Sequence, residues 1–519
     1  MKSQTINQLK TGVVLSYLQM AISIIIGIIY TPFMIKALGR SEYGLYNTVT
    51  STISLISILS LGFNSGYIRY FSKYKKSNDL DSISKLNGLF MIIFLILGGI
   101  ALLCGIFLSF NLNLVFQEGL TSSEYEIGKI LMLLLTINLA VSFPASVFTT
   151  IISANERFVY LKIINLLRTI IGPLITLPIL LSGYGSIQMV IVIVCVSLVA
   201  DFSYMLYVIF KLKNRFIFRG FEKGIFRDIF IFTSFIAINI VVDQVNWNVD
   251  KILLGRFLGT SAVAVYSIGA LLFSFYMTIS TTISSVFTPR VHAIVQNTKN
   301  DLNEQRTQLT NLFIRIGRIQ FLILVLIASG YVFFGMPFII NFWAGPGYED
   351  SYYVALILIV PAIIPFIQNI GIEIQRAQNN HKFRTILYAL MALMNFGLSI
   401  YLIQVMGPIG AAIGTGIAFI LANGLVMNIY YHKKCNIDII SFWKSILRLS
   451  LVLLLPVIVG IVLVLYLNQE NIWLFILSIV LYSLIYILSA WFIGMNDYEK
   501  DLIRVPLKRI FAKKNNNLK

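Results

Sequence analysis

The chain has 519 residues, of which 58% are hydrophobic and only 12% are charged, and its mean hydropathy is +0.84. Soluble globular proteins average about 25% charged residues, so this composition excludes that class and predicts an all-α polytopic membrane protein. The formal net charge of +18 does not indicate a nucleic-acid partner. The basic residues gather in loops on one side of the apolar runs, as they do beside an anionic membrane surface.

Fourteen apolar runs follow one another along the chain, each close to the roughly 20 residues that a membrane-spanning helix needs. The predicted helices cover residues 11–36, 43–70, 86–110, 128–153, 159–182, 187–210, 229–254, 261–288, 311–341, 351–375, 384–405, 409–431, 446–467 and 471–494. The first run is too long for a signal-peptide core and lacks a small-residue cleavage site, so no cleavable signal is expected. The polar segment at 291–310 is expected to be partly helical.

Lysine and arginine separate the loops into a basic set and a bare set. The basic set comprises the loops near 71–85, 211–227 and 433–444 and the tail at 499–519. The loops at 111–126 and 341–351 contain no Lys or Arg. Because cytoplasmic loops carry the excess of Lys and Arg, both termini are predicted to be cytoplasmic.

The stretch from 229 to 260 combines an apolar composition with polar residues at helical spacing. Asn239, Asp243, Asn246 and Asp250 are 4, 3 and 4 residues apart, so they form one stripe at about 100° per residue. Gln244, Asn248 and Lys251 form a second row beside it. A carboxylate facing lipid costs about 3 kcal/mol or more, so the stripe is predicted to line a water-filled path or a partner helix. Asp250 and Lys251 could instead sit at the membrane interface, whereas Asp243 lies about 21 Å past the helix start.

Five further ionisable residues fall within or at the ends of apolar runs. They are Arg168, Asp201, Glu373, Arg69 and Arg290. Arg168 either faces a cavity or extends its charge toward the inner surface. Glu373 is expected to pair with Arg376 at i,i+3 rather than to have a special role. Arg69 and Arg290 lie at the inner ends of their helices, where each is either an anchor at the membrane surface or a ligand contact.

Two pairs of segments indicate an internal repeat. KALGRSEYGLY at 36–46 matches RFLGTSAVAVY at 256–266 in four residues at an offset of 220, and NERF at 155–158 matches NHKF at 380–383 at an offset of 225. The repeat unit then contains six helices, so both copies have the same orientation in the membrane.

The repeat predicts the domain organisation. One six-helix lobe covers residues 1–215 and the other 216–435, followed by two helices in 436–498 and a basic cytoplasmic tail at 499–519. The polar helix at 229–260 begins the second lobe, so its polar face is expected to line the cavity between the lobes.

Residues suited to catalysis or metal binding are scarce. The chain has three cysteines in scattered positions and three histidines in predicted loops. No disulfide framework, metal site or cofactor is expected. No Ser/His/Asp set, paired carboxylates or glycine-rich phosphate loop stands out, so the protein is not expected to be an enzyme. The short outer loops also disfavour a membrane polymerase or ligase.

Several segments resemble a known transporter family. YTPFMIKALGRSEYGLYN, GYIRYFSKY, NVDKILLGRFLGTSAVAVYSIG, NFWAGPGYEDSYYVALILIVPAIIP and NIYYHKK are similar to the Wzx-type polysaccharide biosynthesis exporters of the multidrug/oligosaccharidyl-lipid/polysaccharide superfamily. The resemblance implies a two-lobed, V-shaped, MATE-like carrier in the bacterial cytoplasmic membrane. It implies a flippase that moves a polyprenyl-pyrophosphate-linked oligosaccharide from the cytoplasmic to the outer leaflet.

The family resemblance also implies which residues meet the substrate. Cationic cavity residues of the family are thought to meet the pyrophosphate and acidic sugars, and by position those are Arg168, Lys251 and Arg256. The candidate substrate contacts are Arg168, Lys251, Arg256, Arg69, Arg290 and Asn246, and the candidate cavity or coupling acids are Asp243, Asp250, Asp201 and Glu373. The expected partners are the lipid-linked oligosaccharide, membrane lipids, a polysaccharide polymerase, glycosyltransferases and a coupling ion, H⁺ or Na⁺.

Two other transport functions are compatible with parts of this pattern. A cation-coupled multidrug or small-molecule exporter of the same superfamily would share the fold, but usually lacks the last two helices. Lipid II flippases of the superfamily are expected to carry arginine in the first helix, and VVLSYLQMAISIIIGIIY has none. The expected substrate is therefore a different lipid-linked saccharide.

Overall fold

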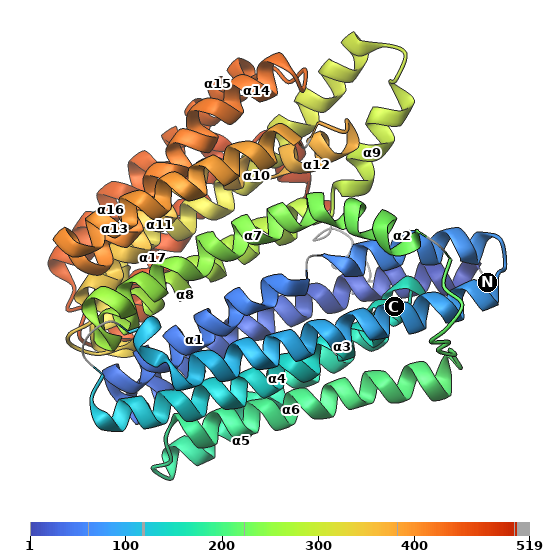
Figure 1. Cartoon of the computed structure of the whole chain (residues 1–519). Coiled ribbons are helices and arrows are strands. Elements are labelled where there is room, and N and C mark those ends of the chain that lie inside the picture. The colour runs from blue at the N-terminus through green and yellow to red at the C-terminus, as the bar shows by residue number, and fades with distance from the viewer. Residues whose placement is uncertain are drawn as a thin grey trace, which may run out of the picture. The chain divides into compact units, whose positions relative to one another are not determined.

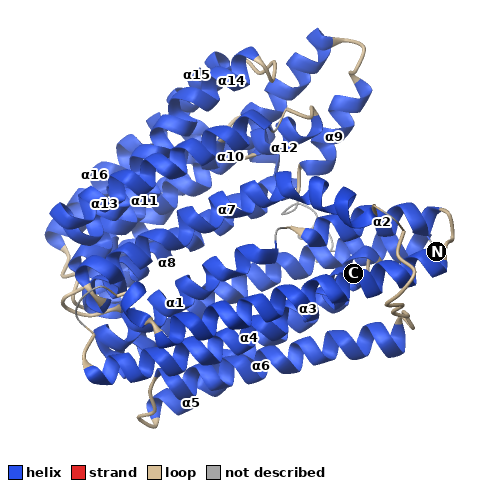
Figure 2. Ribbon diagram, in the orientation of Figure 1, coloured by secondary structure: helices blue, strands red, loops and turns tan. Residues whose placement is uncertain are grey.

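The computed structural model describes residues 2–60, 62–116, 120–222, 224–380, 382–502 and 504–505. Within these ranges the chain is helical, with short turns between helices and no strand (Figure 2). The predicted all-α membrane fold is confirmed. The protein is a multi-pass membrane protein, because helix after helix has the length and composition to cross a bilayer.

The chain divides into two compact units, of which the first contains residues 1–268 and 388–414. Its helices are α1 (Lys2–Ile56), η1 (Ser57–Ser60), α2 (Phe63–Lys76), α3 (Leu80–Phe110), η2 (Leu112–Leu114), α4 (Ser122–Ala154), α5 (Phe158–Leu181), α6 (Ser186–Leu206), η3 (Tyr207–Lys211), α7 (Ile225–Leu258), the start of α8 (Thr260–Ser285) and the middle of α13 (Lys382–Phe419). Of these, α1 and α3 to α6 lie side by side in Figure 1.

The second unit contains residues 269–387 and 415–519. Besides the rest of α8 and α13, it comprises α9 (Thr288–Asn297), α10 (Leu302–Pro337), η4 (Phe338–Trp343), α11 (Glu349–Ile367), α12 (Ile370–Ala377), η5 (Ile420–Val426), α14 (Met427–Lys433), α15 (Ile439–Ser450), η6 (Leu451–Leu453), α16 (Leu454–Tyr466), α17 (Ile472–Ser489) and η7 (Ala490–Gly494). The expected helix within 291–310 is present as parts of α9 and α10. These units differ from the lobes at 1–215 and 216–435, which stay a prediction from the repeat.

The number of membrane crossings differs from the fourteen that the apolar runs predict. In the described ranges, eleven helices are long and apolar enough to cross, or twelve if the pair Ile225–Ser234 and Ile236–Leu258, bent by 43°, is one span. The segments Val14–Lys76 and Lys382–Lys433 are 63 and 52 residues long, more than two crossings of about 20 residues each. If each of these two segments crosses twice, twelve spans become the predicted fourteen, and that total stays a prediction.

Two glycines that match in the repeat have the same unusual backbone conformation. Gly39 has φ 72° and ψ 174°, and Gly259 has φ 78° and ψ −177°. Side chains with a Cβ rarely adopt a positive φ of this kind, so glycine allows the chain to turn here. Gly39 interrupts α1, and Gly259 separates α7 from α8, at equivalent places in the two copies. The shared geometry accords with a duplicated helix–turn–helix.

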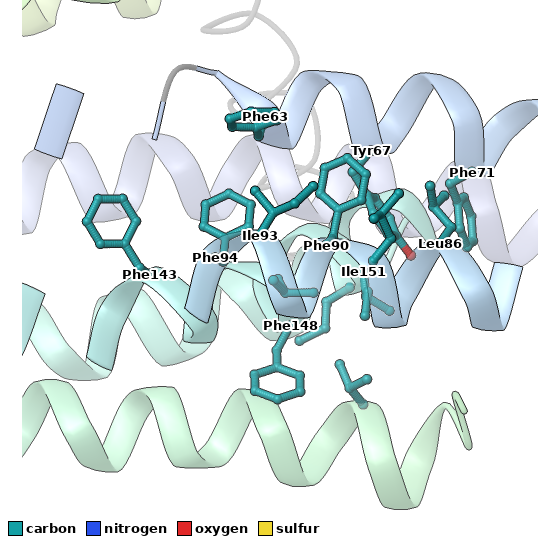
Figure 3. Packing of buried hydrophobic residues seen from close by; sticks show 14 of the residues in the cluster. Phe63, Tyr67, Phe71, Leu86, Phe90, Ile93, Phe94, Phe143, Phe148 and Ile151 are labelled. Atoms are coloured by element: carbon teal, nitrogen blue, oxygen red, sulfur yellow. The ribbon is translucent and has the colours of Figure 1, made fainter. Parts of the chain in front are cut away.

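A core rich in aromatic side chains packs α2, α3 and α4 of the first unit together. The cluster includes Tyr67 and Phe71 of α2, Phe90 and Phe94 of α3, and Phe148 of α4 (Figure 3). The Tyr67 and Phe90 rings meet edge to face, with centroids 5.1 Å apart. Such contacts add about 0.5–1.5 kcal/mol to the burial of the rings, so α2 is fixed against α3.

Side-chain caps define where several helices begin. Thr121 and Glu124 form a capping box at the start of α4, in which each side chain bonds the other residue's backbone N–H. Asp79 caps α3 through Ser82, and Asp438 caps α15 through Ser441. The serine hydroxyl and backbone N–H that donate to each aspartate lower the pKa of its carboxyl group. The caps thus remain charged acceptors at the polar ends of the helices.

Candidate functional site

A polar cavity lies within the first unit, between α2, α4, α5 and α6. It has a volume of about 460 Å³. The residues that line it include Asn64, Thr149, Asn165, Arg168, Asp201 and Tyr204. This volume lies within the range of about 300–1,000 Å³ that is typical of small-molecule sites.

The two ionisable residues of this cavity lie at similar distances along their own helices. Arg168 is ten residues from Phe158, where α5 begins, and Asp201 is ten residues from Lys211, where η3 ends. At 1.5 Å per residue, each lies about 15 Å from that end of its helix, which is half of the roughly 30 Å thickness of a bilayer core. Both residues therefore lie well inside helices that are long enough to cross a membrane.

Arg168 and Asp201 remain separate although they share the cavity. They are near enough to interact electrostatically, but they form no ion pair in the described part of the chain. Asp201 Oδ2 is buried and accepts no hydrogen bond from any described residue. The Arg168 side chain is exposed and lines the cavity. The sequence singled out both residues, and the fold brings them into one cavity.

The polar stripe of α7 changes from exposed to buried along the helix. Asn239 and Asp243 are exposed, and Asn246 is half-buried. Asp250 is only 2% exposed and accepts hydrogen bonds from Tyr266 Oη of α8 (2.8 Å) and Ser399 Oγ of α13 (3.0 Å). The buried end of the stripe is thus a carboxylate with hydrogen-bond partners on α8 and α13, as a buried charge requires.

The second polar row of α7 is partly engaged within the helix. Asn248 Nδ2 donates to Gln244 Oε1 at 2.7 Å, a pair at i,i+4. Lys251 is half-buried. Tyr30 occupies the position in the first repeat that Asp250 occupies in the second. The first copy of the repeat therefore has a phenol at the position where the second copy has a carboxylate.

Hydrogen bonds join α1, α4 and α8 around Glu124. The Glu124 carboxylate accepts from Ser41 Oγ of α1 and from Thr260 Oγ1 of α8 (3.1 Å), and the two hydroxyls lie 2.9 Å apart. A Cβ on Gly44 would lie 1.8 Å from the Thr260 carbonyl oxygen, so only glycine allows α1 and α8 to approach so closely. Nearby, Arg256 Nη1 donates to the Leu114 carbonyl at 3.2 Å.

The remaining candidate residues lie away from the cavity. Arg69 has its guanidinium 4.5 Å from the Phe232 ring of α7, a cation–π contact. Arg290 is exposed on α9. Glu373 pairs with Arg376 at 2.7 Å, as the i,i+3 spacing predicts. None of these three lines the cavity between α2, α4, α5 and α6.

Sequence reasoning missed three features of the structure. Glu124 and the two hydroxyl partners of Asp250 gave no signal, because their roles depend on contacts between distant helices. The ion pair of Arg318 and Glu499, with Nε–Oε1 at 2.6 Å, was also missed. The feature of the sequence that could have indicated this pair is the charge of Arg318 within the apolar run at 311–341. No group of three or more His, Cys, Asp or Glu side chains suited to a metal ion occurs in the described ranges.

Comparison with known proteins identifies a family match and several structures of similar fold. The profile of the family described as "Polysaccharide biosynthesis protein" matches residues 9–295, more than half of the chain. No curated protein sequence matches the chain. Among solved structures, "Lipid II flippase MurJ, inward closed conformation" has a TM-score of 0.70 and 19% identity, and the match covers 94% of this chain and 100% of that one.

Two multidrug transporters are also similar in structure. An inward-facing multidrug resistance MATE family transporter of the MOP superfamily has a TM-score of 0.62 and 13% identity, over 85% of this chain and 99% of that one. The MATE multidrug transporter DinF-BH has a TM-score of 0.60 and 15% identity, over 83% and 96%. At such identities the likeness establishes the fold, which is that of MOP-superfamily transporters, as the sequence predicts.

Proposed function

Because the chain belongs to the polysaccharide biosynthesis protein family, we propose that it is a flippase for a polyprenyl-pyrophosphate-linked oligosaccharide. The lipid-linked sugar moves from the cytoplasmic to the outer leaflet of the bacterial plasma membrane and supplies surface polysaccharide assembly. The protein acts as a carrier and not as a catalyst. The observation that carries this proposal is the polar cavity of the first unit, which Arg168 of α5 lines.

Arg168 is the proposed pyrophosphate contact. The substrate brings about two negative charges, and a guanidinium can hold phosphate oxygens through two hydrogen bonds at once. A charge of this kind is costly in the membrane interior unless a cation or water receives it. Arg168 lines a cavity of about 460 Å³ and is exposed, so its donors are accessible to a ligand.

Lys251 and Arg256 are the proposed contacts later in transport, toward the outer side. They are five residues apart on α7, so the helix turns them about 140° from each other. They are therefore not suited to grip one phosphate together. The substrate is instead handed from Arg168 to Lys251 or Arg256 as the carrier changes from inward to outward opening.

Asp250 is the proposed coupling residue, which takes up a proton or a small cation. What supports this is a carboxylate that is only 2% exposed and that joins α7 to Tyr266 of α8 and Ser399 of α13. Such a carboxylate favours a positive charge in its surroundings. Asp243, exposed on the same stripe, is proposed as an acid of the transport path.

The proposed orientation leads to a direct test of topology. Reporters fused after Asn78, Lys223 and Asn515 are expected in the cytoplasm, and reporters at Gly119 and Gly347 outside, because Lys and Arg accumulate in cytoplasmic loops. Lys223, Gly119 and Asn515 lie outside the described residues. Alkaline phosphatase and fluorescent-protein fusions measure the side of each site. An external Lys223 reporter would overturn the orientation.

The function itself is tested by export of surface glycan in a strain that lacks the chromosomal copy. The parent chain should restore export, and Arg168→Ala should reduce it at least about tenfold, since the loss of a charged hydrogen bond costs about 1.5–3 kcal/mol. Arg168→Lys keeps the charge without the two-pronged geometry, so a partial loss is expected.

The matched control is Lys299→Ala, which removes an exposed cation from the turn between α9 and α10. Export should remain normal in this variant at equal protein level. If the parent chain restores no export, the proposed function is wrong. If Arg168→Ala transports as well as Lys299→Ala, Arg168 is only an anchor for the inner surface.

A further inference from the structure

We propose that the cavity between α2, α4, α5 and α6 also binds the sugar next to the pyrophosphate, through hydroxyl groups that the sugar donates. This inference rests on the proposed flippase function and names a second subsite of the same cavity. Arg168 receives the phosphate. The hydroxyl row of α4 and the Asp201 carboxylate receive the sugar.

The α4 wall of the cavity consists of hydroxyl groups whose protons are already used. Ser142, Ser146, Thr149 and Thr150 each donate to a backbone carbonyl three or four residues earlier in α4, at 2.6–2.9 Å. A hydroxyl group has one proton and two lone pairs. These side chains can therefore only accept further hydrogen bonds, and a ligand at this wall must donate.

The cavity walls formed by α2 and α6 carry oxygen atoms that accept no hydrogen bond from the described residues. Asp201 Oδ2 and Asn64 Oδ1 are both buried and accept no hydrogen bond from any described residue. Asn165 Oδ1 already accepts from Tyr204 Oη at 3.1 Å. Both residues line the cavity, and the last torsion of each side chain is soft, so its oxygen can turn toward a ligand. A ligand hydroxyl there supplies the donor that the protein does not.

The phosphate and the sugar of the substrate differ in their hydrogen-bonding groups, and this difference assigns each to its own part of the cavity. An ionised phosphate carries only acceptors and would meet like charge at Asp201, so it belongs at Arg168. A sugar ring carries several hydroxyl donors, and these match the acceptor-rich side. The hydroxyl side chains that line the cavity from Ser142 to Ser153 extend over eleven residues, or about 17 Å along α4. This length is sufficient to contact a sugar bound next to the phosphate.

The test measures binding to the full-length protein in lipid nanodiscs. One probe is a polyprenyl pyrophosphate without sugar, and the other is the same lipid carrying one hexose. The parent should bind the hexose-bearing lipid about tenfold more tightly. Thr149→Val and Asp201→Leu, which remove acceptors while nearly keeping the side-chain shape, should each reduce that preference about fivefold. Thr149→Val should leave affinity for the bare lipid unchanged, and Asp201→Leu should not weaken it, because this change also removes a negative charge near the phosphate.

Thr307→Val is the matched control, because it deletes an exposed hydroxyl on α10 that is bonded to its own helix in the same way. It should keep the preference of the parent. Arg168→Ala should weaken both probes. If the parent binds both probes equally, or if Thr149→Val and Asp201→Leu leave the preference intact, the sugar subsite is wrong while the flippase proposal stands. If neither probe binds, the proposed function itself fails.

Discussion

Replacing Arg318 with alanine is expected to destabilise the protein by about 3–5 kcal/mol, because the change leaves the buried Glu499 carboxylate without its partner. Arg318 of α10 is 8% exposed and Glu499 is 3% exposed. The two form a bidentate pair, with Nε–Oε1 at 2.6 Å and Nη2–Oε2 at 2.9 Å. This loss is the largest effect on stability that we expect from a single substitution of the chain.

The surroundings of the pair explain why it fixes the end of the chain. Arg318 also donates to the Gly494 carbonyl (2.8 Å) and to Ser445 Oγ of α15 (3.2 Å), so one guanidinium joins three segments. Glu499 in turn accepts from the backbone N–H of Asn496, whose side chain accepts from Glu499 N–H. The ion pair and this reciprocal cap together hold the segment after α17 against α10.

Thermal unfolding of the purified protein in detergent measures the effect. The half-unfolding temperature of Arg318→Ala should fall by roughly 3–5 °C. The control is Arg315→Ala on the same helix, which removes an exposed guanidinium 3.9 Å from the Tyr498 ring and should cost only about 0.5–1 kcal/mol. The double variant Arg318→Met with Glu499→Leu should recover most of the stability, because no charge is left unpaired. Equal melting of the two single variants would contradict the account.

The class and the helical segments could be predicted from the sequence, because membrane crossing imposes a simple length and polarity rule. The repeat was also visible, and Gly39 and Gly259 show why, since a turn that requires positive φ keeps its glycine in both copies. What the pattern does not show is where a helix continues through such a turn. α1 extends from Lys2 to Ile56 across Gly39. The number of apolar runs in the sequence therefore differs from the number of helices in the structure.

The site could be predicted only as a set of polar residues in apolar surroundings. The cost of a charge in lipid indicated Arg168, Asp201 and Asp250, because each needs a reason to be there. Which of them meet is decided by packing between distant segments. Asp250 and Ser399 are 149 residues apart, and Arg318 and Glu499 are 181 apart. No periodicity within one helix carries that information.

The second large effect is expected at Asp250. Asp250→Asn should lower transport at least about tenfold and remove its response to an ion gradient. The amide has nearly the same shape. Its oxygen can accept from one of the hydroxyl groups of Tyr266 and Ser399, and its NH2 group can donate to the other, so the protein should fold. It cannot take up a proton or offset a bound cation, since it carries no charge. Ser399→Ala removes one hydroxyl donor to Asp250 and should give an intermediate rate.

Proteoliposomes containing a lipid-linked saccharide with a fluorescent label measure the rate, with a pH or sodium gradient imposed across the membrane. The parent should respond to one of the two gradients, which identifies the ion. Asp228→Asn is the control, because Asp228 is an exposed carboxylate in the first turn of the same helix, and it should behave as the parent. An Asp250→Asn protein that still accelerates under the gradient would show that coupling resides elsewhere. The exposed Asp243, two turns before Asp250 on the same stripe, would then be the carboxylate to replace next.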